Sequence, residues 1–378
     1  MTKLDTESIA IGVGLLILAI LVVSVLARRR RDQEYVGLTP GLEPVDPRSA
    51  SVRRVRGGVE WKGQVAPQFS PPRGMGPAVA GTIIDGSVDS RDLAAMLVDL
   101  SLRGWYRLQH IGPPGKGKGD WVFHQAAQPP SGDRLSPAEQ RMLSAIFAGG
   151  PQVSLAGLRP HLKIKLREVQ IDLYREMIQR GWYRDHPRSR NGIPALIGVL
   201  LIPGAAVLAW VAYTLQRDQG AVYAWALPAG ALAAAIVLIT FGRGRTPRTA
   251  SGTAARIQVL GFREYLATAE ADQIKFEEAA NLLPRYLPFA LAFGLADRWA
   301  KLVRDVQRDA QLAGYGDLTS GWDSMPDLFL FTDFASDATS LFVDGAGCID
   351  GCDGCDGLDG CDGCDGCDGL DGCGGCDW

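Results

Sequence analysis

The chain has 378 residues, a formal net charge of −3 and 47% hydrophobic residues, which is enough for two or three modest domains. The charge is unevenly spread: residues 28–192 carry 26 Lys and Arg against 16 Asp and Glu, whereas residues 344–378 carry ten Asp and no basic residue. All eight Cys lie at or beyond Cys348, so none can cross-link a folded core. This distribution excludes a disulfide-built secreted domain.

Three apolar runs are long enough to cross a bilayer as helices, namely residues 9–27, 193–215 and 221–241. The first meets four arginines at residues 28–31, which suits an uncleaved anchor better than a signal peptide. The second and third are separated only by residues 216–220, so they form an antiparallel pair whose outer ends emerge on one side. We expect Pro203 and Pro228, which lie inside these two runs, to bend their helices.

Basic residues flank the membrane segments mainly on one side. Arginine clusters adjoin every span on the side of residues 28–192 and 242–378, whereas the other side carries only Lys3 and Arg217. We predict a multi-pass protein of the plasma membrane, and the positive-inside rule predicts its orientation. Residues 1–8 and 216–220 would lie outside, and the two long segments in the cytoplasm.

Two segments have the composition of irregular structure. Residues 28–77 are basic and rich in Pro and Gly, and we expect a partly extended linker, with order beginning near Ala78. Residues 344–378 form a Cys-Asp-Gly tract with few apolar residues, and we expect this tail to be disordered.

Residues 78–128 predict a first winged-helix-like unit. A helix with apolar spacing runs from a cap at Ser90 to a stop at Gly104. A β-hairpin follows, with strands near residues 105–111 and 121–124.

A second winged-helix-like unit is predicted for residues 129–192. It opens on a capping box formed by Ser136 and Glu139. The pentapeptide Arg-Gly-Trp-Tyr-Arg recurs at the same helix-to-strand junction of both units, at residues 103–107 and 180–184. We interpret the pair as an internal repeat, so the units stand in tandem.

Residues 242–343 predict a cytoplasmic helical hairpin. Its first helix spans residues 254–281 and is ended by Pro284 and Pro288, and its second spans residues 289–306. The predicted fold class is thus a mainly α membrane protein. It combines three transmembrane helices, tandem winged-helix-like units with a small β-hairpin, this C-terminal hairpin and the disordered tail.

Five short segments are similar to one known family: DGSVDSRDL at 85–93, RGWY at 103–106, LGFREYL at 260–266, RYLPFA at 285–290 and ADRWA at 296–300. With the Gly-rich tail ending in Trp378, they make residues 78–378 resemble the predicted bacterial membrane proteins called domain of unknown function 2207 (DUF2207). Members usually begin with a signal peptide and an extracytoplasmic β-rich domain, and we expect this chain to be a form lacking both. The family has no established activity, so the resemblance implies topology and no chemistry.

The tail offers a metal-binding hypothesis. Its Cys-x-x-Cys pairs place two thiolates on one tight turn, as zinc or an iron–sulfur cluster requires. The candidate ligands are Cys352, Cys355, Cys361, Cys364, Cys367, Cys373 and Cys376. The opposing interpretation is a flexible tail with reduced thiols, because spacers of Asp, Gly, Leu and Ile give a metal site no hydrophobic support. We predict no cofactor, with zinc at the tail as the alternative.

Nucleic-acid binding is a second alternative. Winged helices and a basic region are typical of DNA binders. Lys116 and Lys118 lie in the hairpin loop, and Lys163, Lys165 and Arg167 lie in a later helix. Against it, winged helices also bind proteins, and anionic lipid attracts juxtamembrane arginines.

No catalytic constellation is visible in the sequence. The four His show no ligand or triad spacing. The loop at residues 112–119 fails as a phosphate-binding loop, because Gly119 stands where Ser or Thr would hold magnesium. We therefore predict a non-enzymatic, membrane-anchored cytoplasmic interaction or regulatory module. Its predicted partners are the lipid bilayer and an unidentified cytoplasmic protein.

Overall fold

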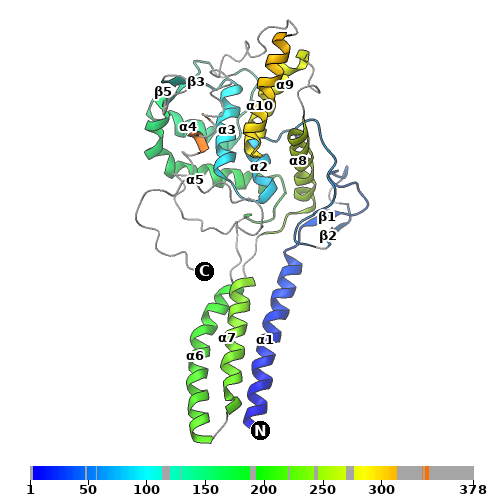
Figure 1. The fold of residues 1–378 in the computed structure, drawn as a ribbon, viewed down its shortest axis with the longest axis vertical. Coiled ribbons are helices and arrows are strands. Elements are labelled where there is room, and N and C mark those ends of the chain that lie inside the picture. Colours follow the sequence, from blue (N-terminus) through cyan, green and yellow to red (C-terminus); the bar gives the residue numbers. More distant parts are fainter. Residues whose placement is uncertain are drawn as a thin grey trace.

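The computed structural model describes residues 3–46, 49–56, 58–112, 120–128, 130–187, 193–219, 222–241, 246–269, 276–312, 334 and 337–339. These residues form a three-helix bundle joined end-on to a mainly helical domain (Figure 1). The tail and the loop at residues 113–119 lie outside the described residues.

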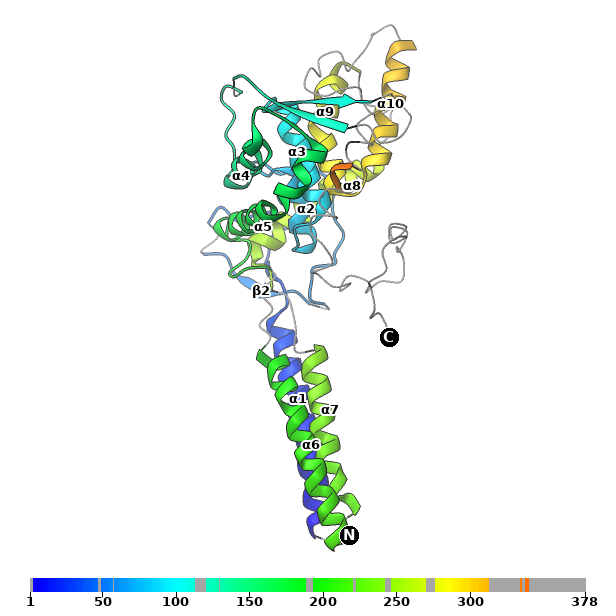
Figure 2. The same ribbon diagram turned by 90° about the vertical axis from the view of Figure 1, so that its left-hand side faces the viewer.

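The bundle consists of α1 (Lys3–Arg29), α6 (Ile193–Gln219) and α7 (Ala226–Phe241), which lie side by side in both views (Figures 1 and 2). All three are long and apolar enough to cross a membrane, over Thr6–Arg29, Ile193–Arg217 and Tyr223–Phe241. The prediction of three spans is therefore confirmed. The domain adjoins the C-terminal ends of α1 and α7 and the N-terminal end of α6 (Figure 1).

The two prolines behave differently. Pro203 lies inside α6, as predicted. Pro228 does not, because a 3₁₀ turn at Val222–Trp225 precedes α7 and leaves Pro228 in its first turn. A helix tolerates proline there, since the first-turn N–H groups have no intrahelical acceptor, so the predicted interior bend at Pro228 was wrong.

Small residues let α7 approach both neighbours closely. A Cβ added to Gly12 of α1 would lie 2.3 Å from the carbonyl oxygen of Ala226, and one on Gly230 would lie 2.3 Å from the carbonyl oxygen of Gly12. A Cβ added to Gly198 of α6 would lie 2.8 Å from the carbonyl oxygen of Ala235. Close backbone approach is how helices associate in lipid, where burial of apolar surface supplies no driving force between them.

We expect Gly12→Val to lower the thermal unfolding midpoint of the detergent-purified protein, because the new side chain would enter the backbone of α7. Overpacking of this kind costs about 1–3 kcal/mol. Gly14→Val is the matched control, since a Cβ at Gly14 meets no heavy atom within 4 Å. Equal losses in both variants would show that valine acts through helix propensity and not through the α1–α7 contact.

The central part of the domain combines helices with a three-stranded antiparallel sheet. Its elements are α2 (Pro77–Asp85), α3 (Ser90–Leu102), β3 (Tyr106–Ile111), β4 (Asp120–Gln125), α4 (Pro137–Ile146), β5 (Gln152–Ser154) and α5 (Leu155–Gln179). The sheet order is β3-β4-β5. Because β5 pairs with β4, the segments predicted as two tandem units share one sheet. Their winged-helix assignment stays a prediction.

The N-caps of α3 and α4 lie at or next to the predicted residues. Ser136 and Glu139 form the predicted capping box of α4. The N-cap of α3 is Asp89, which forms a capping box with Asp92, and not Ser90 as predicted. A carboxylate at the N-cap satisfies the same free N–H groups as a serine hydroxyl.

The repeated pentapeptide builds the same helix stop twice. Gly104 after α3 and Gly181 after α5 both have positive φ, at 82° and 74°. The N–H of Trp105 donates to the carbonyl of Leu100, and the N–H of Trp182 donates to that of Met177. This six-to-one hydrogen bond is the Schellman motif, which favours glycine because its left-handed residue carries no Cβ.

The C-terminal helices are α8 (Ala250–Thr268), α9 (Phe276–Ala292) and α10 (Ala296–Leu312). The predicted boundaries at residues 254–281 and 289–306 were wrong, because Pro284 and Pro288 lie inside α9. The proline cost is outweighed by burial of the apolar side of α9, including Leu287 and Leu291.

Residues 28–77 have little regular structure but pack on the domain. Strands β1 (Gln33–Tyr35) and β2 (Val52–Arg54) pair antiparallel, and β1 contacts α8. Further on, the N–H of Gln68 donates to the carbonyl of Gly261, and the hydroxyl of Tyr286 donates to that of Phe69. The expectation that order begins near Ala78 was therefore wrong, because this segment finds its partners on α8 and α9.

Candidate functional site

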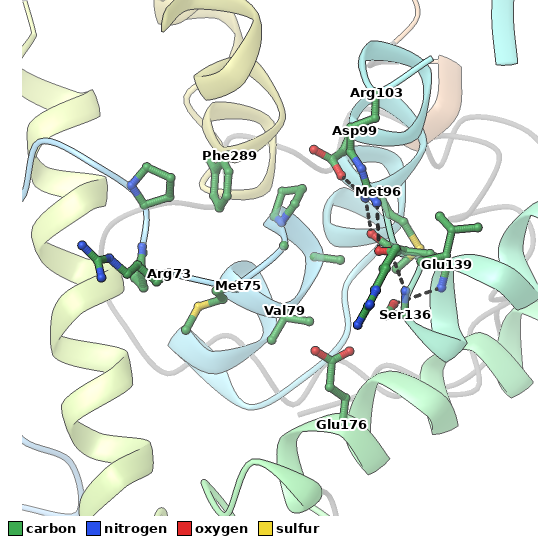
Figure 3. Close-up of a pocket in the computed structure, with 18 of the residues that line it drawn as sticks. Arg73, Met75, Val79, Met96, Asp99, Arg103, Ser136, Glu139, Glu176 and Phe289 are labelled. Carbon is green, nitrogen blue, oxygen red and sulfur yellow. Dashed lines mark hydrogen bonds and ion pairs between the residues drawn. The ribbon is translucent and has the colours of Figure 1, made fainter. Parts of the chain in front are cut away.

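A charged cleft with a volume of about 970 Å³ opens in the domain (Figure 3). Its walls come from residues 70–79, α3, residues 133–139, α5 and α9. It thus gathers chain segments that are far apart in the sequence, including part of the segment predicted to be a linker.

Arg103 is the centre of one wall. Its position at the C-cap of α3 aims the guanidinium at three carboxylates. Nη1 lies 2.9 Å from Asp99 Oδ2 and 2.5 Å from Glu139 Oε1, and Nε lies 2.8 Å from Asp133 Oδ2. Asp133 also accepts a hydrogen bond from Trp105 Nε1 at 2.7 Å. The planar guanidinium thereby ties α3 to the segment that leads into α4.

The carboxylates of this cluster differ in acidity. Burial raises the pKa of Asp99 to about 6, although hydrogen bonding and charge from Arg103 oppose the shift. Partial burial would also raise the pKa of Asp133, but hydrogen bonds from Arg103 and Trp105 outweigh it and lower this pKa. The cleft therefore holds one carboxyl that titrates near neutral pH beside one that stays ionised.

The floor of the cleft is apolar, with one carboxylate reaching into it. Met75, Val79 and Met96 are buried there, and Glu176 points toward them from α5 (Figure 3). One oxygen of Glu176 pairs with Arg180 Nη2 at 2.6 Å. The other, Oε2, is buried and has no hydrogen-bond partner among the described residues. A buried acceptor without a partner is costly and indicates a place where a donor would be favoured.

Three arginines at the cleft are exposed, and their side chains form no ion pair with any residue that the structure describes: Arg73, Arg134 and Arg285. Each comes from a different segment of the cleft wall. Together with the apolar floor, they give the cleft an affinity for a ligand with both anionic and apolar groups.

A second polar cluster joins the domain to the membrane helices. Arg248, which follows α7, is 1% exposed and pairs with Asp32 at 3.1 Å and with Glu60 at 3.2 Å. Its Nη2 donates to the carbonyl oxygens of Ile83 and Ile84 at the end of α2. Asp32 follows α1, so one buried guanidinium connects the exits of two spans to the domain.

The residues proposed from sequence lie elsewhere. Lys116, Lys118 and all seven candidate cysteine ligands fall outside the described residues. Lys165 and Arg167 are exposed on α5. Within the described ranges, no group of three or more His, Cys, Asp and Glu is arranged to hold a metal ion. The sequence reasoning missed Arg103 and Arg248. For Arg103 the repeated pentapeptide marked the position, but it gave no sign of the three carboxylates.

The pH dependence of stability tests the environment of Asp99. Its pKa is about 6 in the folded protein against an ordinary value of 3.8, so the folded state retains a proton that the unfolded state releases between these values. Stability therefore rises as the pH falls from about 6 to about 4, and this gain is lost as the pH rises again.

We expect Asp99→Asn to reduce the stability gained between about pH 7 and about pH 5 by about 1–2 kcal/mol, because the amide does not titrate. Chemical denaturation at both pH values measures the difference. Glu264→Gln, an exposed site on α8, is the control. A pH dependence unchanged from the parent protein would contradict the assigned shift.

One family model matches the chain: residues 66–302, more than half of its length, match the C-terminal domain of a predicted membrane protein, DUF2207. The match includes α6, α7 and every wall of the cleft. No curated protein and no solved structure matched the chain.

Proposed function

Since this chain belongs to the DUF2207 family of predicted membrane proteins, we propose that it is a membrane-anchored cytoplasmic interaction or regulatory module. The domain receives its partner in the cleft, and the three spans hold it at the plasma membrane. The observation that carries this proposal is the cleft itself, with three exposed arginines around a buried apolar floor.

The charge distribution supports a cytoplasmic domain. Arg28 to Arg31 lie at the C-terminal end of α1, and Arg248 follows α7, both next to the domain. By the positive-inside rule this side faces the cytoplasm, with the N-terminus of α1 and the α6–α7 turn outside.

The chemistry of the cleft favours a protein segment with acidic and apolar side chains. Carboxylates on such a segment would pair with Arg73, Arg134 and Arg285, as arginines pair bidentately with carboxylates. A methionine-rich floor suits varied apolar side chains, because methionine is flexible and polarizable. A backbone N–H or a hydroxyl on the segment would satisfy Glu176 Oε2.

Charge reversal at the rim tests the proposal. The full chain carrying Arg73→Glu and Arg285→Glu is compared with the parent in affinity capture from detergent-solubilised cells, followed by quantification of co-purifying proteins. We expect at least one protein captured by the parent to fall more than tenfold, since reversal replaces attraction with repulsion. Arg304→Glu, an exposed site on α10, is the control. Identical capture by parent and double variant would refute the cleft as the binding site.

A further inference from the structure

The structure points to an anionic-lipid binding surface on the β1–β2 hairpin, residues 33–56, and we propose that this hairpin docks on phospholipid headgroups of the leaflet facing the domain. Strand β1 begins four residues after the end of α1, at Gln33. In Figures 1 and 2, β2 lies at the base of the domain, near the end of α1. The hairpin is therefore held at headgroup level by the span itself.

Direct contacts fix β2 to the end of the membrane helix. Arg54 Nη1 donates to the carbonyl oxygens of Arg28 and Arg29, the last residues of α1. These carbonyls have no intrahelical donor, and a cation there is favoured by the helix dipole. Gln33 pairs with Arg54 across the strands, so β2 cannot move away from the helix end without breaking both links.

The outer strand is basic and open to solvent. All three residues of β2 are exposed. Arg53 pairs with Glu34 at 2.7 Å and neutralises it. Arg56, just after β2, is exposed, and its side chain has no ion-pair partner among the described residues. Arg28 and Arg29 at the end of α1 are exposed as well. Each arginine near an anionic surface contributes about fivefold in binding.

Apolar side chains on the same hairpin are also exposed. Val45 is fully exposed, and Leu42 and Val52 are 56% and 45% exposed. Glu43 and Asp46 lie beside Val45 on the loop, so the arginines of β2 and α1, and not the loop tip, supply the attraction for anions. Val52 adjoins Arg53 on β2, and an exposed apolar residue next to basic ones, at the end of a transmembrane helix, matches the interface between headgroups and acyl chains.

Hydrogen exchange of the full chain in nanodiscs tests this inference. A two-stranded hairpin is marginally stable by itself, so headgroup binding to its closed form slows exchange of its amides. We expect peptides covering residues 33–56 to exchange several-fold more slowly with phosphatidylglycerol in the bilayer than in phosphatidylcholine alone. In Arg56→Gln, the ratio of the exchange rate in phosphatidylcholine to that with phosphatidylglycerol falls by about fivefold or to unity. Peptides from α8 report that the domain remains folded.

Two further variants separate the possible causes. Arg304→Gln on α10, at the far end of the domain (Figure 2), should keep the full parental ratio. Val45→Asp should speed exchange of the hairpin in both bilayers. Equal exchange of the parent in the two bilayers would overturn the proposal. An Arg304→Gln variant that loses the lipid-dependent slowing of exchange as fully as Arg56→Gln would also overturn it. So would protection of the hairpin that depends on Val45 but not on lipid charge.

Discussion

Replacing Arg248 with Met is expected to lower the free energy of unfolding by about 3–5 kcal/mol, the largest single effect among the contacts described. The reason is that the buried groups that contact the guanidinium would lose their partner. Asp32 is completely buried and would lose its ion pair with the Arg248 guanidinium at 3.1 Å. The carbonyl oxygens of Ile83 and Ile84 would lose donors at 3.0 and 2.8 Å. Denaturant unfolding of the detergent-purified protein, followed by tryptophan fluorescence, measures the loss.

The double variant Arg248→Met with Asp32→Asn separates this cause from simple loss of packing. The double variant removes the guanidinium together with the buried carboxylate, and Glu60 keeps its ion pair with Arg256 at 2.9 Å. The double variant should therefore be more stable than the sum of the two single losses implies. Arg304→Met, at an exposed position, should change the stability by less than about 0.5 kcal/mol. Strict additivity of the two substitutions would contradict the ion pair as the source of the effect.

Membrane architecture followed from local features of the sequence. The length of a span depends only on the run of apolar residues. The runs at residues 193–215 and 221–241 therefore predicted α6 and α7 without any tertiary information. The α4 cap was equally local, since Ser136 and Glu139 are three residues apart. Features of this kind need no knowledge of distant partners.

The packing of residues 28–77 and the two polar clusters depend on distant partners. Asp32 and Arg248 are 216 positions apart, and each taken alone looks like an ordinary charged residue beside a span. The same holds for Gln68, whose backbone finds an acceptor on α8. Composition predicts that such a segment lacks helices and strands, but it says nothing about what the segment packs against.

The error in α8 and α9 has a different origin. Propensity places a helix end before Pro284, because proline removes an intrahelical hydrogen bond. In the fold, Leu287 and Leu291 are buried, and Gly294 with φ of 70° provides the stop instead. Tertiary burial thus overrides the local signal, which single-sequence reasoning cannot weigh.

Arg103 ranks second in expected effect. We expect Arg103→Met to destabilise the protein by about 3 kcal/mol near pH 7, because Asp99, Asp133 and Glu139 would be left around an apolar side chain. The three carboxylates are only 12–31% exposed, so solvent screens their repulsion incompletely. Arg103→Lys keeps the charge but not the planar, two-pronged guanidinium, and it should lose roughly half as much stability as Arg103→Met.

Acidification should reverse part of this loss of stability. Arg103 is what opposes the effect of burial on Asp99, so its removal raises the pKa of Asp99 beyond about 6. The folded variant then takes up a proton that the unfolded chain does not bind until about pH 4, and its stability rises as the pH falls. Unfolding measured at about pH 7 and about pH 5 should show about 1 kcal/mol of the deficit recovered at the lower pH, because Asp99 of the parent also takes up a proton in this range. A deficit of equal size at both values would mean that Arg103 stabilises the cleft by packing, and that the three carboxylates do not repel one another.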